Sequence, residues 1–214
     1  LKQFKTKNLK GFGIDGLSVG IVAAGVVLHY LNETQSAALT HVSRVTIYDT
    51  AEYMLLDSST RRNLEITMTT EGEKDGSLFS ALDDTYTPMG GRLLKKWISM
   101  PLKNRGQIER RLNAVEELYD SQKINQLREE LKKIGDIERL ATKIATLRAN
   151  PRDLVALKNS LIILPDIAKF SLAFDDTYLT QLGSSIPNLQ EVTGKLENAL
   201  KDEPGLNIGK GNVF

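Results

Sequence analysis

The sequence has no cysteine, only two histidines and a single tryptophan among its 214 residues. The lack of cysteine excludes a disulfide framework, a thiol nucleophile and any zinc or iron–sulfur site that uses cysteine ligands. His29 and His41 are separated in sequence and have no cluster of other metal ligands beside them, whereas metal and catalytic-triad sites need several convergent groups. The sequence therefore predicts no catalytic centre in this chain.

Long hydrophobic runs are also missing. The most apolar stretch, residues 19–31, is about 13 residues long and ends in His29 and Tyr30, whereas a membrane-spanning helix needs ~20 apolar residues. No secretory signal stands at the start of the sequence. With 28 basic against 27 acidic residues, the overall charge favours neither a nucleic-acid partner nor a membrane partner. We therefore expect a soluble cytoplasmic protein.

Two glycine-rich segments have the composition, but not the context, of nucleotide-binding loops. Residues 11–16 match G-x-G-x-x-G, but no apolar strand precedes them and no βαβ pattern follows, so a loop that enters a helix is the better interpretation. Residues 205–211 lack both the spacing of a P-loop and its magnesium-binding Ser or Thr. No cofactor site is expected in this chain.

The periodicity of the sequence predicts a mainly α-helical bundle. Apolar residues recur at steps of three and four along successive segments, such as Ile108, Leu112, Val115 and Tyr119, which indicates one apolar stripe per helix. Breaks at Gly135 and Asn150-Pro151 favour several packed helices over one long coiled coil. Residues 45–48 and 53–56 alternate instead with a period of two, which predicts a small β-hairpin near the N-terminal third.

Residues 60–66 and 87–102 are the least generic part of the chain. Asp57 and the serines after it offer N-caps for a short helix that holds Arg61 and Arg62, and Thr87-Pro88 predicts the start of a helix that runs to about residue 99. The pair Gly90-Gly91 costs ~1 kcal/mol per glycine relative to alanine inside a helix. We therefore expect another element to pack closely against these glycines.

A basic segment covers residues 88–111, with seven basic residues and one acidic residue. Its candidate contacts with a DNA backbone are Lys95, Lys96, Lys103 and Arg105. Such a cluster can meet DNA phosphates, can pair with the acidic region at residues 71–84, or can face a partner domain. The sequence alone leaves these three possibilities open.

Six separated segments resemble, in order, parts of the MutS family of DNA mismatch-repair proteins. Residues 23–35 look like the end of its connector domain. The segments that resemble its core, or lever, domain are residues 56–65, 78–102, 110–118, 136–140 and 148–154. The resemblance implies that residues 1–46 are the C-terminal part of the connector and that residues 47–214 are the N-terminal part of the lever, ending where the family's DNA clamp would begin.

The same resemblance implies a mechanical function. The family's mismatch-reading Phe-x-Glu motif and its P-loop ATPase do not occur in this sequence, which predicts a non-catalytic fragment that couples the clamp and mismatch recognition to the ATPase. ATP and magnesium are expected only in the full-length family member. The implied partners are mismatched double-stranded DNA, the other MutS domains, a second copy in a homodimer, and repair proteins bound through the connector.

Two other functions stay open. One is a stand-alone module that binds the DNA backbone through residues 88–111, and the other is a helical scaffold that binds other proteins through residues 1–40. No functional residue that is established for the family falls on a position of this sequence, so the DNA-contact residues named above are derived only from charge.

Overall fold

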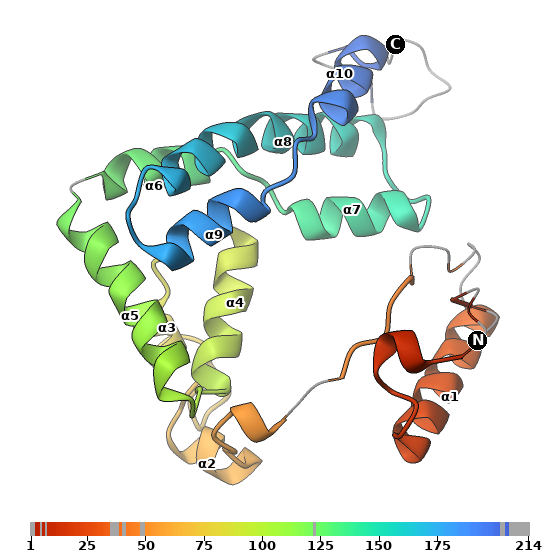
Figure 1. The fold of residues 1–214 in the computed structure, drawn as a ribbon, viewed down its shortest axis with the longest axis vertical. Coiled ribbons are helices and arrows are strands. Elements are labelled where there is room, and N and C mark those ends of the chain that lie inside the picture. The colour runs from red at the N-terminus through yellow and green to blue at the C-terminus, as the bar shows by residue number, and fades with distance from the viewer. Residues whose placement is uncertain are drawn as a thin grey trace. The chain divides into compact units, whose positions relative to one another are not determined.

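The computed structural model describes residues 3–4, 6, 8–34, 39, 42–47, 50–121, 123–201 and 204–205. The chain divides into two compact units, the first formed by Leu1–Asp49 with Ala141–Ala149 and the second by Thr50–Leu140 with Asn150–Phe214. Helices make up most of the described residues (Figure 1). The prediction of a mainly helical fold is confirmed.

The first unit is built around α1 (Ser18–Thr34), which follows a short 3-10 turn, η1 (Lys10–Phe12). Ser18 is the first residue of α1 rather than the cap before it. The sequence also predicts a second short helix over residues 33–39, and most of these residues fall outside the described part of the chain. Among the helices that the structure describes, none is long and apolar enough to cross a membrane.

The second unit contains, after the 3-10 turn η3 (Thr50–Glu52), the helices α2 (Ser58–Asn63), α3 (Leu78–Leu82), α4 (Pro88–Ser99), α5 (Arg105–Asp120), α6 (Ile124–Lys132), the first residues of α7 (Ile137–Ala145), α8 (Pro151–Leu172), α9 (Thr177–Ser185) and α10 (Gln190–Ala199). The predicted caps Asp57 and Thr87 are confirmed, and Ser77 caps α3 in the same way, because each side chain accepts a hydrogen bond from the backbone N–H three residues further on. Local sequence signals therefore set where these short helices begin.

The predicted β-hairpin is wrong. Residues 45–47 and 54–56 are in no strand, and Tyr53 forms an isolated antiparallel bridge with Leu102. The N–H of Met54 donates to Pro101 O at 2.7 Å, and the N–H of Lys103 donates to Glu52 O at 3.0 Å. A run of four alternating residues shows that a segment can pair but not with which partner, and the partner is the segment after α4.

The second unit packs mainly around α8, which contacts α6, α9 and α10. The approach between α8 and α9 is close: a Cβ at Gly183 would lie 2.9 Å from the carbonyl oxygen of Ala168. Buried Ser160, 1% exposed, accepts a hydrogen bond from Gly135 N–H at 3.0 Å and donates to Ala156 O at 2.8 Å. These contacts fix α8 against the turn before α7 and against α9.

Helix α5 packs on a different face from the one that its apolar periodicity predicts. Ala114 is buried with Phe174 and Leu179, and Glu117 accepts hydrogen bonds from the N–H groups of Asp175 and Asp176, just before α9. The predicted stripe is exposed instead: Ile108 37%, Leu112 60%, Val115 61% and Tyr119 81%. The amphipathic pattern was identified correctly, but the described residues leave this face uncovered.

Gly90 and Gly91 have close neighbours, but not the separate element that was predicted. A Cβ at Gly90 would lie 3.0 Å from the Thr87 hydroxyl, and a Cβ at Gly91 would lie 3.2 Å from the Thr85 hydroxyl. The neighbour is thus the turn that leads into α4. Any larger side chain would push this turn away from the helix.

Candidate anion-binding pocket

A pocket lies where α2, the loop after α2 and α4 come together. The chain leaves α2 through Glu65, a non-glycine residue with φ of 49°, which is the left-handed conformation that side chains rarely adopt. The turn is attached to the start of α3, because the N–H groups of Leu78 and Phe79 donate to the carbonyl oxygens of Glu65 and Ile66 at 3.0 and 2.9 Å. These hydrogen bonds hold the strained turn in place.

The loop at residues 67–72 forms part of the pocket wall. Thr70 donates to the Glu65 carboxylate through its N–H at 2.7 Å and through its hydroxyl at 3.1 Å. The N–H of Thr69 donates to Glu73 O at 2.8 Å, and Gly72, with φ of 89°, donates to Thr69 O at 3.0 Å. The loop is therefore organised by its own hydrogen bonds.

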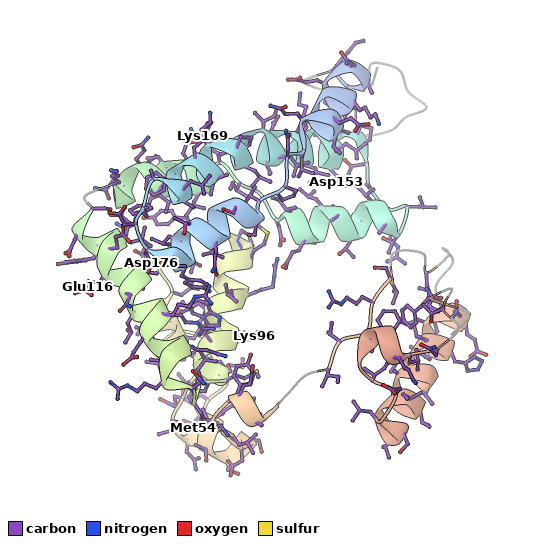
Figure 2. All side chains as sticks on the ribbon, in the orientation of Figure 1. Met54, Lys96, Glu116, Asp153, Lys169 and Asp176 are labelled. Carbon is purple, nitrogen blue, oxygen red and sulfur yellow. The ribbon has the colours of Figure 1, made fainter. Side chains whose placement is uncertain are left out.

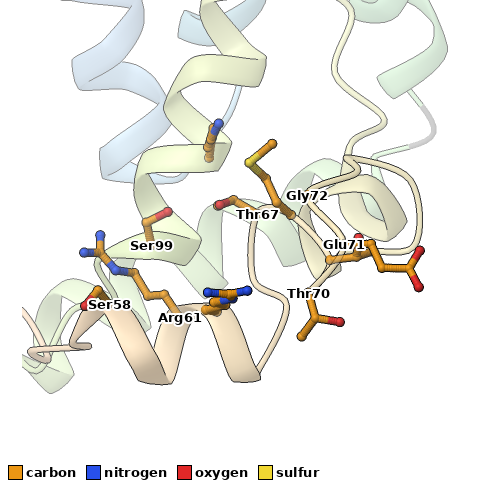
Figure 3. A pocket seen from close by; sticks show the side chains of 11 residues that line it. Ser58, Arg61, Thr67, Thr70, Glu71, Gly72 and Ser99 are labelled. Atoms are coloured by element: carbon orange, nitrogen blue, oxygen red, sulfur yellow. The ribbon is translucent and has the colours of Figure 1, made fainter.

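The pocket has a volume of about 650 Å³ and brings together three cationic side chains: Arg61 and Arg62 from α2, and Lys95 from α4 (Figure 3). Five hydroxyl side chains also line it: Ser58, Thr67, Thr69, Thr70 and Ser99. Glu71 is the only carboxylate in the lining, and in the view of Figure 3 its side chain extends away from Arg61. The lining thus consists mainly of hydrogen-bond donors and positive charges.

The carboxylates next to these cations already have partners. The Asp57 carboxylate accepts from Thr60 N–H at 2.6 Å. That hydrogen bond, with a smaller contribution from the charge of Arg61, keeps the pKa of Asp57 below its usual value. Glu65 is held by Thr70. Among the described residues, no ion pair involves Arg61, Arg62 or Lys95, so their charges are available to a ligand.

Of the four predicted DNA-contact residues, one lines this pocket. Lys95 lines the pocket, whereas Lys96 (Figure 2), Lys103 and Arg105 do not. The Arg105 guanidinium pairs with Glu109 within α5 at 2.7 Å. The structure thus singles out Lys95, and contact of any of the four with DNA stays a prediction.

Other arginines of the basic segment contribute to the fold. Arg92 pairs with Asp136 and Glu138, each at 2.7 Å, and its hydrogen bonds lower the pKa of Asp136 to about 2. Arg110 lies 4.5 Å from the Tyr178 ring centroid and hydrogen-bonds Gln181, and Arg111 lies 3.7 Å from the Trp97 ring centroid. Such cation–π contacts help to fix the helices that carry the rings.

The acidic region at residues 71–84 is not neutralised by the basic segment. Asp83 pairs with Lys74 at 3.1 Å, and Asp84 pairs with Arg128 at 3.5 Å. Within the described part of the chain, no group of three or more His, Asp or Glu side chains is placed to hold a metal ion. Two of the five acidic residues in this region are thus paired with cations that lie outside the basic segment.

The sequence reasoning missed Arg61 and Arg62 as site residues. It used them only as part of a family signature, although adjacent arginines just after a capped helix start were a visible signal of concentrated charge. What the sequence did not show is that Lys95, more than thirty positions later, lines the same pocket.

Comparisons with known proteins agree with the resemblance seen in the sequence. Residues 59–214 match the family model described as MutS domain III. Over the whole chain, the sequence is 42% identical to the DNA mismatch repair protein MutS of Salinibacter ruber and 43% identical to that of Halothermothrix orenii. The MutS protein of Alkaliphilus oremlandii is 43% identical over 99% of the chain. The chain spans 24% of the length of each of these relatives.

Proposed function

Because the chain belongs to the MutS family of DNA mismatch-repair proteins, we propose that it is a non-catalytic lever and connector segment of a longer protein. In this proposal residues 1–46 form the end of the connector and residues 47–214 the first part of the lever. The segment couples DNA clamping and mismatch recognition to ATP hydrolysis, and these three activities belong to other domains. The start of the family match at residue 59 supports the lever assignment.

The observation that carries the proposal is the set of side-chain contacts between different helices of the second unit. Arg92 links α4 to the start of α7 through Asp136 and Glu138, and Ser160 links α8 to Gly135. Helices that are tied in this way move as a body rather than separately, which is the physical requirement for transmitting a displacement.

The exposed stripe on α5 supports the same proposal. A monomer rarely leaves a continuous apolar face in water, and Leu112, Val115 and Tyr119 are all more than half exposed. Such a face is expected of a segment that packs against further helices of a longer protein. Partners in the proposal are the remaining MutS domains, a second copy of the protein, and mismatched duplex DNA.

The test uses the longer MutS protein that contains this segment. The variant Arg92→Gln removes the link between α4 and α7, and Lys195→Gln removes an exposed ion pair that lies entirely within α10. Coupling energies of this kind are typically about 1–3 kcal/mol, or roughly 5- to 150-fold in affinity. We expect Arg92→Gln to reduce the effect of a mismatched duplex on ATP affinity, and Lys195→Gln to leave it unchanged.

Two results would count against the lever proposal. One is that a mismatched duplex changes the ATP affinity of the Arg92→Gln variant as much as it changes that of the parent protein. For this comparison, the two proteins must bind ATP equally well without DNA. The other is ATP hydrolysis, or a preference for mismatched over paired duplex, by the 214-residue chain alone. A preference of the chain alone for mismatched duplex would replace the proposal with a direct DNA-binding function.

A further inference from the structure

We propose that the pocket formed by Arg61, Arg62 and Lys95 is a binding site for a phosphate group. This site is independent of the lever proposal, because it depends only on the lining of the pocket. Its three cations come from two helices, its hydroxyls come mainly from the intervening loop, and no ion pair among the described residues satisfies the cations.

The balance of charge in the lining favours an anionic ligand. The lining holds three cations and one carboxylate, that of Glu71. Like charges that share a pocket repel one another, and a bound anion would offset this repulsion. The neighbouring acids do not take this role in the described structure, because Asp57 and Glu65 accept backbone N–H donors and form no ion pair with these cations.

The donor set fits a phosphate better than a carboxylate. A carboxylate has two oxygens in one plane, and a single arginine satisfies both. A phosphate group has more acceptor oxygens, spread over a tetrahedron, and carries up to two negative charges. Two guanidinium groups, one ammonium group and several hydroxyls exceed the need of a carboxylate and match that of a phosphate.

The pocket is large enough for more than one phosphate group. Its volume of about 650 Å³ falls within the ~300–1,000 Å³ of ordinary ligand sites, and the exposed positions of Arg61, Arg62 and Lys95 leave it open to solvent. The phosphate can therefore belong either to a small molecule or to a nucleic-acid backbone. The chemistry of recognition is the same in both cases.

The first experiment measures phosphate binding by the 214-residue chain. Inorganic pyrophosphate is titrated at constant ionic strength, and binding is followed by the backbone amide shifts of Thr67, Thr70 and Gly72 in two-dimensional NMR. We expect saturable shifts at these loop residues and none in α10. Acetate at the same ionic strength is the carboxylate control and should produce at least tenfold weaker binding.

The second experiment assigns the binding to the cations. The triple variant Arg61→Gln, Arg62→Gln, Lys95→Gln should lose at least tenfold in pyrophosphate affinity. Lys195→Gln, an exposed change in α10 outside the pocket, should lose none. Because all three side chains are exposed, the triple variant should keep the thermal midpoint of the parent chain. Each single variant, which perturbs the fold less, should show an intermediate loss.

A third arm separates the two sources of the phosphate. If a paired 20-base duplex competes with pyrophosphate and loses affinity in the triple variant, the natural ligand is a nucleic-acid backbone. If the duplex neither competes nor responds to the substitutions, the ligand is a small phosphate compound. The proposal is overturned if pyrophosphate does not saturate, if acetate binds equally well, or if the triple variant binds like the parent.

Discussion

The close approach of α8 and α9 at Gly183 gives a stringent test of how the second unit is packed. A Cβ at this position would lie 2.9 Å from Ala168 O, 3.0 Å from Ser171 Cβ and 3.1 Å from Leu172 Cγ. The nearest of these atoms belongs to the backbone of α8 and cannot rotate away. The variant Gly183→Ala must therefore push the two helices apart or distort one of them.

The magnitude follows from two opposing effects. Overpacking a well-packed core costs about 1–3 kcal/mol, and replacing glycine by alanine inside a helix returns up to ~1 kcal/mol. We expect Gly183→Ala to lower the free energy of unfolding by about 1–2 kcal/mol. The matched control is Gly194→Ala in α10, where a Cβ meets nothing within 4 Å, so that variant should be more stable by about 0.5–1 kcal/mol.

The assay is urea unfolding of both variants and of the parent chain, followed by far-ultraviolet circular dichroism. Equal slopes against urea would show that the midpoints report stability rather than a change in the unfolded state. In thermal unfolding the two variants should shift in opposite directions, by about 2–4 °C for each kcal/mol in a chain of this length. A Gly183→Ala variant as stable as the parent would refute the close packing of α8 on α9.

Three further predictions concern other contacts. Ser160→Ala should lower the free energy of unfolding by about 1–3 kcal/mol, because it leaves the Gly135 N–H without its acceptor. In the same urea unfolding experiment, the control Ser184→Ala, at an exposed position, should change the free energy of unfolding very little. The pKa of Asp136 is about 2 in the folded chain, so the stability from its pairing is fully present above the ordinary carboxyl pKa and is lost as pH falls through 2. In acid unfolding, the Arg92→Gln variant should lose less stability between pH 4 and 2 than the parent chain does. An equal loss of stability in the two chains would contradict the pairing. Exposed Leu112 predicts self-association in sedimentation velocity that Leu112→Glu reduces, whereas a monodisperse parent monomer contradicts it.

The local features of the fold were predictable from sequence. The starts of α2, α3 and α4 depend on a side chain that accepts a hydrogen bond three residues away, and such signals can be read without knowing the tertiary structure. Asp136 and Asn150 act in the same way at the starts of α7 and α8, whereas α6 and α10 begin without a side-chain cap. The family assignment also followed from residues that stand in order along the chain.

Features that depend on distant partners were not predictable. Tyr53 pairs with Leu102 rather than with residues 45–48, because alternation within a short run does not identify the partner strand. The stripe on α5 was recognised, yet the helix buries Ala114 on another face. Periodicity shows that a face is apolar, and only the packed structure shows what covers it.

The pocket is the clearest case, because its cations become neighbours only through the fold. No sequence pattern predicts the left-handed turn at Glu65 or the hydrogen bonds that the turn accepts from Leu78 and Phe79. In the sequence, Arg61 belongs to a segment that resembles the MutS family, and Lys95 was singled out only as part of the basic segment at residues 88–111. The structure joins them in one site.

The geometry of the pocket is held by contacts that do not involve its cations. Hydrogen bonds to Glu65 and Ile66 attach the loop to α3, α3 contacts α4, and Gly91 lets α4 pack against the turn at Thr85. The helices that carry Arg61, Arg62 and Lys95 are therefore positioned before any anion binds. Only the rotamers of these three side chains remain to be ordered, at about 0.5–1.5 kcal/mol each. A phosphate with several charge-assisted hydrogen bonds, each stronger than a neutral one, offsets that cost, whereas a carboxylate held by one arginine offsets only part of it.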